Sequence, residues 1–137
     1  MTETPHPLYA THSDTLNRAL TAIAERGYWS NYPESPSPRV YGEHAAAEGK
    51  AAFEALLGRD FPLDQPGAGE PVATEVSPFG VRLDVRYPHA NVAALIDAGT
   101  AALPAWRDAG PQTRAGVCME ILARLHANIF ELAHAVH

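Results

Sequence analysis

The sequence predicts an α+β piece of a larger α/β fold, with about four helices and one β-hairpin. Three observations indicate this class. Four segments repeat apolar residues at helical spacing, whereas residues 72–88 alternate apolar and polar residues as a strand does. The apolar stripes of the third and fourth helices are wide, so we expect a larger body to cover them. The last helical segment reaches the end of the sequence without a Gly, Asn or Pro to stop it.

The first helix is predicted over residues 13–26. Ser13 suits the N-cap position, because its hydroxyl can accept from a free backbone amide one turn in. Apolar residues then recur on one face at Leu16, Leu20 and Ile23. Gly27 is expected to end the helix in the left-handed conformation.

Residues 27–43, GYWSNYPESPSPRVYGE, are too rich in proline for a helix or a central strand and too aromatic for a solvated linker. We call this segment the strap. We expect it to be extended, close to polyproline II, and to lie across a protein body with its aromatic rings buried. A second helix is predicted at roughly 43–57 with Gly58 as its C′ residue, and residues 59–71 are predicted as a loop.

A β-hairpin is predicted from VATEV (72–76) and GVRLDVRYP (80–88), which SPFG separates. Its apolar face carries Val81, Leu83 and Val85, and Pro88 is expected to end the second strand.

The third helix is predicted within residues 89–110, with Pro104 closing it and Trp106 packing just after. The fourth is expected to start at Gly110 and Pro111 and to run to the end of the sequence.

Composition excludes several classes of protein. The net charge of −6 argues against a nucleic-acid partner, which needs a basic surface. No apolar run approaches the ~20 residues that cross a bilayer. The N-terminal residues lack the pattern of a signal peptide, and a single cysteine excludes an intrachain disulfide. We therefore expect a soluble, cytoplasmic protein with no membrane partner.

The residues predict no catalytic, cofactor-binding or metal site within this chain. Cys118, the one thiol, lies among apolar residues of a helix and is expected to pack rather than react. The histidines are expected at the surface, with His12 and His89 at helix entries and His134 and His137 on one face of the last helix. The full set is His6, His12, His44, His89, His126, His134 and His137.

Two further motifs have a structural interpretation that we prefer. GAGEP (67–71) lacks the G-x-G-x-x-G pattern of a phosphate loop and precedes a strand rather than a helix. Arg107 and Arg114 flank a helix start that could bind an anion, but we expect them to tie a loop to neighbouring carboxylates.

Residues 72–137 resemble the entry segment of the aldehyde dehydrogenase superfamily: a hairpin, a helix ending in Ala-Trp-Arg, a short loop and a helix of the form R-x-x-x-L/C-x-x-I-L-A-x-L. The matching positions are Ala105, Trp106, Arg107, Arg114, Cys118, Ile121, Leu122 and Leu125.

Residues 1–71 look like the N-terminal extension of the phenylacetic acid degradation (PaaN) type, through RGYWSNYPESPSPRVYGE and GKAAFEALLGRDFPLDQPG. The resemblance divides the chain into a family-specific extension (1–71) and a truncated start of the aldehyde dehydrogenase domain (72–137). Cys118 falls on a structural helix of the family pattern, so it is not expected to be the nucleophile.

This resemblance implies an oxidoreductase that converts a ring-opened semialdehyde to the acid with NAD or NADP and that forms a homo-oligomer. The family's catalytic residues and most of its nucleotide-binding region come later in the chain, so this chain alone is expected to be inactive. Its expected partner is the remainder of the aldehyde dehydrogenase body or a full-length homologue. The alternative is a stand-alone truncated paralogue that acts as a protein-interaction module.

Overall fold

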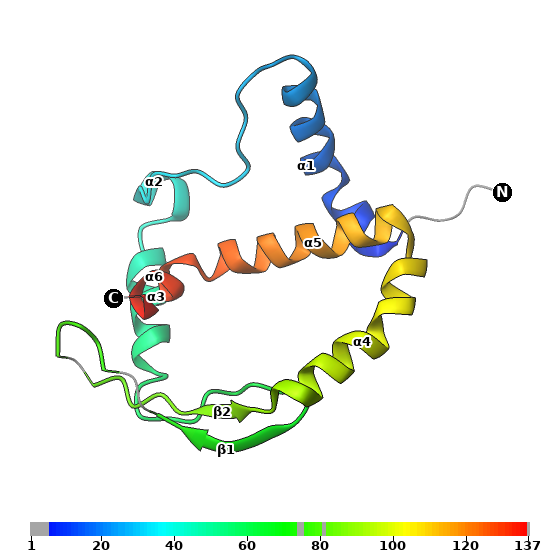
Figure 1. Cartoon of the computed structure of the whole chain (residues 1–137). Helices are drawn as coiled ribbons and strands as arrows, with labels where there is room; N and C mark the ends of the chain where they lie inside the picture. Colours follow the sequence, from blue (N-terminus) through cyan, green and yellow to red (C-terminus); the bar gives the residue numbers. More distant parts are fainter. Residues whose placement is uncertain (1–5, 74–75, 81, 137) are drawn as a thin grey trace. The chain divides into compact units, whose positions relative to one another are not determined.

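The computed structural model describes residues 6–73, 76–80 and 82–136, and these form six helices and one two-stranded sheet (Figure 1). The chain divides into two compact units that alternate along the sequence. Unit 1 contains residues 1–43 and 105–128, and unit 2 contains residues 44–104 and 129–137. The family-based division at residues 71 and 72 stays a prediction.

In unit 1, helix α1 (Pro7–Ala24) begins six residues before the predicted start. His6 caps it: its Nδ1 accepts from the Leu8 amide at 3.3 Å, and Pro7 takes the first helical position. The predicted N-cap, Ser13, therefore lies inside the helix. The left-handed residue at the other end is Arg26 (φ 55°) rather than Gly27.

The strap is irregular over most of its length, as predicted, but the expectation of an extended segment is wrong at residues 38–41. These form the short helix α2 (Pro38–Tyr41), because Ser37 caps it and Pro38 fits the first position. The Tyr41 hydroxyl donates to the Pro33 carbonyl at 2.6 Å, which ties the short helix back to the strap.

Helix α5 (Gly110–Ala127) completes unit 1 and packs on α1. Pro111 lies in its first turn, as predicted. The contact is close: a Cβ built on the buried Gly116 would lie 2.5 Å from the backbone nitrogen of Tyr9. The prediction of one helix to the end of the sequence is wrong, because Asn128 interrupts it and its side chain donates to the Arg124 carbonyl at 2.8 Å.

Unit 2 contains helix α3 (Ala45–Glu54), which ends three residues before the predicted boundary, and helix α6 (Ile129–Ala135). The two helices pack together where Gly49 lets the backbone and Cβ of Phe130 approach. Gly58 adopts φ 70° after α3, so the expected left-handed glycine is present but lies beyond a further turn.

The sheet consists of strands β1 (Ala68–Val72) and β2 (Tyr87–Ala90), which pair antiparallel. The predicted hairpin is confirmed in direction and in its SPFG tip, where the Gly80 amide donates to the Ser77 carbonyl at 2.8 Å. Its regular strands, however, lie further from the tip than predicted. Pro88 does not end the second strand but faces Pro71 within the ladder.

A different pairing explains this displacement. Residues 83–86 form backbone hydrogen bonds with residues 58–61, at the predicted end of the second helix and the start of the predicted loop. The Gly58 amide donates to the Leu83 carbonyl at 3.1 Å, and Arg86 exchanges bonds with residues 59 and 61. Val85 is buried (7% exposed) as the alternation predicts, whereas Val81 and part of VATEV lie outside the described residues.

Helix α4 (Val92–Asp108) starts after Asn91, whose side-chain oxygen accepts from the Ala94 amide at 3.1 Å. The expected entry residue His89 belongs instead to β2. Pro104 lies inside the helix and does not close it, contrary to the prediction. A proline removes one backbone hydrogen bond, and this one lies at the division between the two units.

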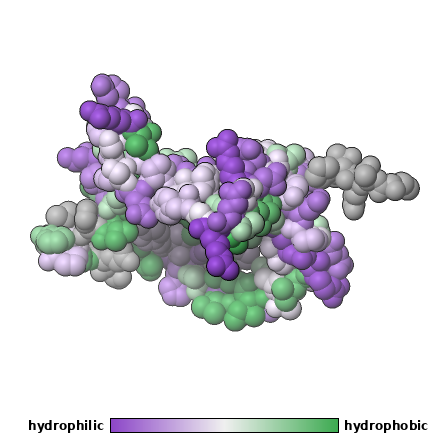
Figure 2. Space-filling model, turned by 90° about the horizontal axis from the view of Figure 1, so that it is seen from above, coloured by the Kyte–Doolittle hydropathy of each residue, from purple (hydrophilic) through white to green (hydrophobic). Residues whose placement is uncertain are grey.

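Little of the apolar surface is buried in the described residues. Val85 is the one large hydrophobic side chain among them that is buried, whereas α4, α5 and α6 leave many exposed. Figure 2 shows hydrophobic residues at the surface in the view from above. The exposed residues on these helices are Val92, Ile96, Leu103, Trp106, Ile121, Leu122, Leu125, Ile129 and Leu132, and the exposed Val136 follows the end of α6.

None of the described helices is long and apolar enough to cross a membrane.

Candidate functional site

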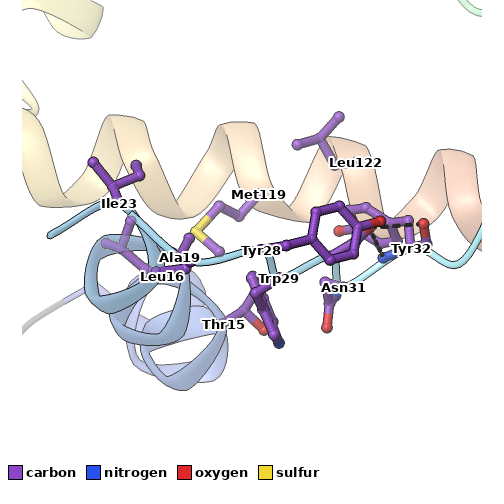
Figure 3. Close-up of a pocket in the computed structure, with 13 residues that line it drawn as sticks. Thr15, Leu16, Ala19, Ile23, Tyr28, Trp29, Asn31, Tyr32, Met119 and Leu122 are labelled. Carbon is purple, nitrogen blue, oxygen red and sulfur yellow. Dashed lines mark hydrogen bonds between the residues drawn. The ribbon is translucent and has the colours of Figure 1, made fainter. Parts of the chain in front are cut away.

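An apolar groove of about 520 Å³ lies within unit 1, between α1, the first residues of the strap and α5 (Figure 3). Three elements supply its walls, and none of the lining residues carries a charge. They are Thr15, Leu16, Ala19, Ala22, Ile23, Gly27, Tyr28, Trp29, Ser30, Asn31, Tyr32, Met119 and Leu122. We call this surface the strap groove.

The strap groove forms because the chain reverses direction after α1. The left-handed conformation of Arg26 ends the helix and starts the strap, which brings Trp29 and Tyr32 to the same groove as Leu16. Ser30 then fixes the local turn: its hydroxyl donates to the Tyr32 carbonyl at 2.9 Å and accepts from the Tyr32 amide at 3.2 Å.

A histidine holds the far end of the strap on α5. The ring of His126 lies 4.8 Å from that of Tyr32 and 5.3 Å from that of Tyr41, between centroids. Its Nδ1 is buried and has no hydrogen-bond partner among the described residues. His126 is thus half-buried in an aromatic cluster. The prediction that it lies at the surface is wrong.

A second contact joins α1 to α5 through polar side chains. The Nε2 atom of His12 lies 2.8 Å from Oε2 of Glu120, and Arg124 Nε donates to the other carboxylate oxygen at 2.8 Å. The hydrogen bond from Arg124, and after it that from His12, lowers the pKa of Glu120 below its ordinary value. The prediction that His12 lies at a helix entry is wrong, because it lies more than one turn inside α1.

This lowered pKa predicts an acid-dependent loss of stability. A carboxyl group whose pKa is lower in the folded state stabilises the fold above its unfolded pKa, and this contribution disappears as the pH falls through the folded-state pKa. The thermal midpoint of the chain should therefore fall on acidification. In Glu120→Gln this dependence should be weaker, whereas Glu25→Gln, at an exposed carboxyl, should retain it. Identical pH profiles for the two variants would contradict the assignment.

Cys118 is exposed on α5, so the prediction that it packs in an apolar interior is wrong for this chain. The residues of α5 that contact α1, such as Gly116 and Glu120, lie on a different side of the helix. Among the described residues no hydrogen bond or ion pair links Cys118 to a histidine or a carboxylate, as an activated nucleophile would need.

The described histidines do not assemble a metal site. No group of three or more potential ligands occurs among the described residues. The ring of His134 stacks on Phe53 in unit 2, with centroids 6.3 Å apart and an interplanar angle of 20°. His137 lies outside the described residues, and His6 and His44 occupy N-cap positions.

Arg107, at the end of α4, and Arg114, near the start of α5, have structural roles. Arg114 Nη1 donates to the Arg107 carbonyl at 2.9 Å and to the Trp106 carbonyl at 3.4 Å, and Arg107 pairs with the Asp108 carboxylate at 2.9 Å. Arg114 thus ties α5 to the end of α4, whereas Arg107 bonds to its own sequence neighbour. Arg114 does so through backbone carbonyls at the end of α4, and not through the carboxylates that we expected.

The glycine-containing run at residues 67–71 does not form a phosphate loop. The glycine-containing run GAGEP enters β1 and is not followed by a helix N-terminus. A Cβ on Gly67 would lie 2.6 Å from Cβ of Ala94, so packing against α4 explains this glycine (φ 67°) without a bound phosphate. The structural interpretation of the motif therefore holds.

One solved structure similar to this chain is that of an NAD-dependent aldehyde dehydrogenase from Burkholderia multivorans. The two share 54% sequence identity with a TM-score of 0.86, over 97% of this chain and 24% of that chain. No protein-family model matches the sequence, and no curated protein matches it. With a coverage of 24%, the chain spans about a quarter of the length of the Burkholderia multivorans enzyme. The predicted fold class, an incomplete part of an α/β aldehyde dehydrogenase fold, is confirmed.

Proposed function

We propose that this chain, which has the sequence and fold of part of an aldehyde dehydrogenase superfamily protein, forms the N-terminal quarter of an enzyme that oxidises an aldehyde to an acid with NAD. The observation that supports this is the identity of 54% to an NAD-dependent enzyme over nearly the whole of this chain. The likeness is therefore one of sequence, at 54% identity, as well as of fold, at a TM-score of 0.86.

The chain's own role in this proposal is structural. Among the described residues no histidine or carboxylate bonds to Cys118, and the run at residues 67–71 forms no phosphate loop. In this proposal the reacting groups and the cofactor site belong to the remainder of the enzyme. The exposed apolar residues of α4, α5 and α6 are the surface that this remainder covers. The intact enzyme is a homo-oligomer in this proposal.

A chimera tests this role directly. This chain would replace the matched quarter of the Burkholderia multivorans enzyme, and NAD⁺ reduction would be followed by absorbance with an aliphatic and an aromatic aldehyde. The chimera should retain activity within about tenfold of the parent enzyme, a barrier change of ~1.4 kcal/mol. The purified chain alone should reduce neither NAD⁺ nor NADP⁺.

Two results would contradict the proposal. The first is a chimera that does not fold although the parent does. The second is turnover by the isolated chain. As a reference for assembly, the parent enzyme lacking its matched quarter should be inactive.

A protein-interaction module is the second candidate, because the same exposed apolar residues could contact another protein. The isolated chain distinguishes the two. A part of an enzyme should unfold with a broad, weakly cooperative transition, since few of its large side chains are buried. A self-sufficient module should instead be a stable monomer with a sharp transition.

The substrate class that we propose is a semialdehyde formed by ring opening during phenylacetate degradation. The support for it is the resemblance of residues 26–43 and 49–67 to the extension of the PaaN type. A strain that lacks the gene should grow on glucose but not on phenylacetate as sole carbon source. Restoring the intact gene should restore growth, and unimpaired growth of the deletion strain on phenylacetate would exclude this substrate class.

A further inference from the structure

We propose that the strap groove binds an uncharged apolar segment from the part of an aldehyde dehydrogenase chain that lies outside this sequence. This inference rests on the proposed function and identifies one docking surface for that partner. The groove would then join the strap, α1 and α5 to the enzyme body at a single place.

The exposure of the groove walls supports an occupant. Ile23 is 75% exposed, Tyr28 86% and Leu122 50%, although all three line the same groove. Figure 3 shows these side chains together with Met119 and Leu16 along the groove. An apolar side chain that stays in water forgoes about 1.5–3 kcal/mol of burial, so several of them beside one hollow favour association.

The lining also defines the chemistry of the occupant. No Asp, Glu, Lys or Arg lines the groove, although 19% of the chain is charged. A charged occupant would lose its hydration without gaining a partner. Besides Ser30 and the tyrosines, the lining includes the hydroxyl of Thr15 and the side-chain amide of Asn31. Both groups can form hydrogen bonds with a backbone amide or carbonyl. This combination fits a short polypeptide segment with adjacent aliphatic or aromatic side chains.

The openness of the groove argues for a polypeptide over a small ligand. Small-molecule sites bury some 70–90% of their ligand, whereas here the rim residues Ile23 and Tyr28 stay largely in solvent. The length of the relative supports the rest of the enzyme as the source of this segment. This chain covers only 24% of that enzyme, so most of such a chain is available to fill the groove.

Charge substitutions in the chimera test this inference. Ile23→Asp and Leu122→Asp should each lower its thermal midpoint by about 5 °C or more, because the new carboxylate would be buried without a partner. Leu20→Asp is the matched control: Leu20 lies on the same helix and is 53% exposed, but it does not line the groove. In the isolated chain Ile23→Asp should change the midpoint little, since the groove is empty of its occupant.

The outcomes separate this inference from the proposed function. A folded, active chimera in which the groove variants are as stable as Leu20→Asp would overturn the docking surface alone. Failure of the unmodified chimera to fold would overturn both. A third result, dimers of the isolated chain that Leu122→Asp dissociates in sedimentation experiments, would assign the groove to a second copy and also overturn the inference.

Discussion

Gly116→Ala is expected to separate α1 from α5 and to destabilise unit 1 by about 1–3 kcal/mol, as over-packing does in tight contacts. The atoms that the new methyl group would meet are backbone: N of Tyr9 at 2.5 Å, its Cα at 2.8 Å and the carbonyl carbon of Leu8 at 2.9 Å. Backbone atoms within a helix cannot rotate away as a side-chain end can. The two helices must therefore move apart and lose contact along their length.

The same substitution at another helical glycine provides the control. Alanine is a better helix former than glycine by up to ~1 kcal/mol, so Gly→Ala stabilises where space is available. Nothing lies within 4 Å of a Cβ built on Gly99 of α4. In the isolated chain, Gly99→Ala should raise the thermal midpoint measured by circular dichroism and Gly116→Ala should lower it. Two shifts of the same sign would show that the close approach does not constrain the packing.

Tyr32→Ser should detach the strap from α5, and Trp29→Ser should weaken its contact with α1. Both aromatic side chains are half-buried, in contrast to Tyr28 at 86% exposed. Each loss should cost about 1–3 kcal/mol, from lost apolar burial and, for Tyr32, the ring contact with His126. The strap prolines limit the freedom of the unfolded chain, so the ordered state depends on few contacts.

Stability of the chimera and hydrogen exchange of α5 would measure this effect. The Tyr32→Ser variant should expose amides near His126, because the ring that covers this residue is removed. Tyr28→Ser in the isolated chain is the control and should have little effect. Unchanged stability in both Trp29→Ser and Tyr32→Ser would mean that the strap does not hold unit 1 together.

The sequence alone was sufficient to predict most local features. Helical periodicity identified the bodies of α1, α3, α4 and α5, and the turn residues placed the SPFG tip of the hairpin. The composition of the strap indicated an irregular segment with aromatic contacts. These features depend on residues close together in the chain, whose spacing carries the signal. Resemblance over nearly the whole chain also indicated the superfamily, in agreement with the relative at 54% identity.

Long-range contacts were decided by the tertiary structure. His12 and Glu120 are 108 positions apart, so nothing near His12 in the sequence revealed its partner, whereas the paired Glu120 and Arg124 are only four positions apart on one helix. The strands moved outward because residues 83–86 bond to residues 58–61, in a segment that looked like a loop. In the sequence, nothing distinguishes Met119 from the other apolar residues of its helix. Its place in the groove follows from the packing of α1 and the strap beside it.

The sequence by itself thus determined where helices form, which segment is irregular and which family the chain resembles, because each follows from local spacing or shared motifs. Only the tertiary structure decided that Pro104 stays within a helix, that Asn128 interrupts one, and that Cys118 is exposed. A helix can continue through proline, or a thiol can face solvent, according to what packs on either side. Those neighbours come from distant parts of the chain, whose positions no local pattern encodes.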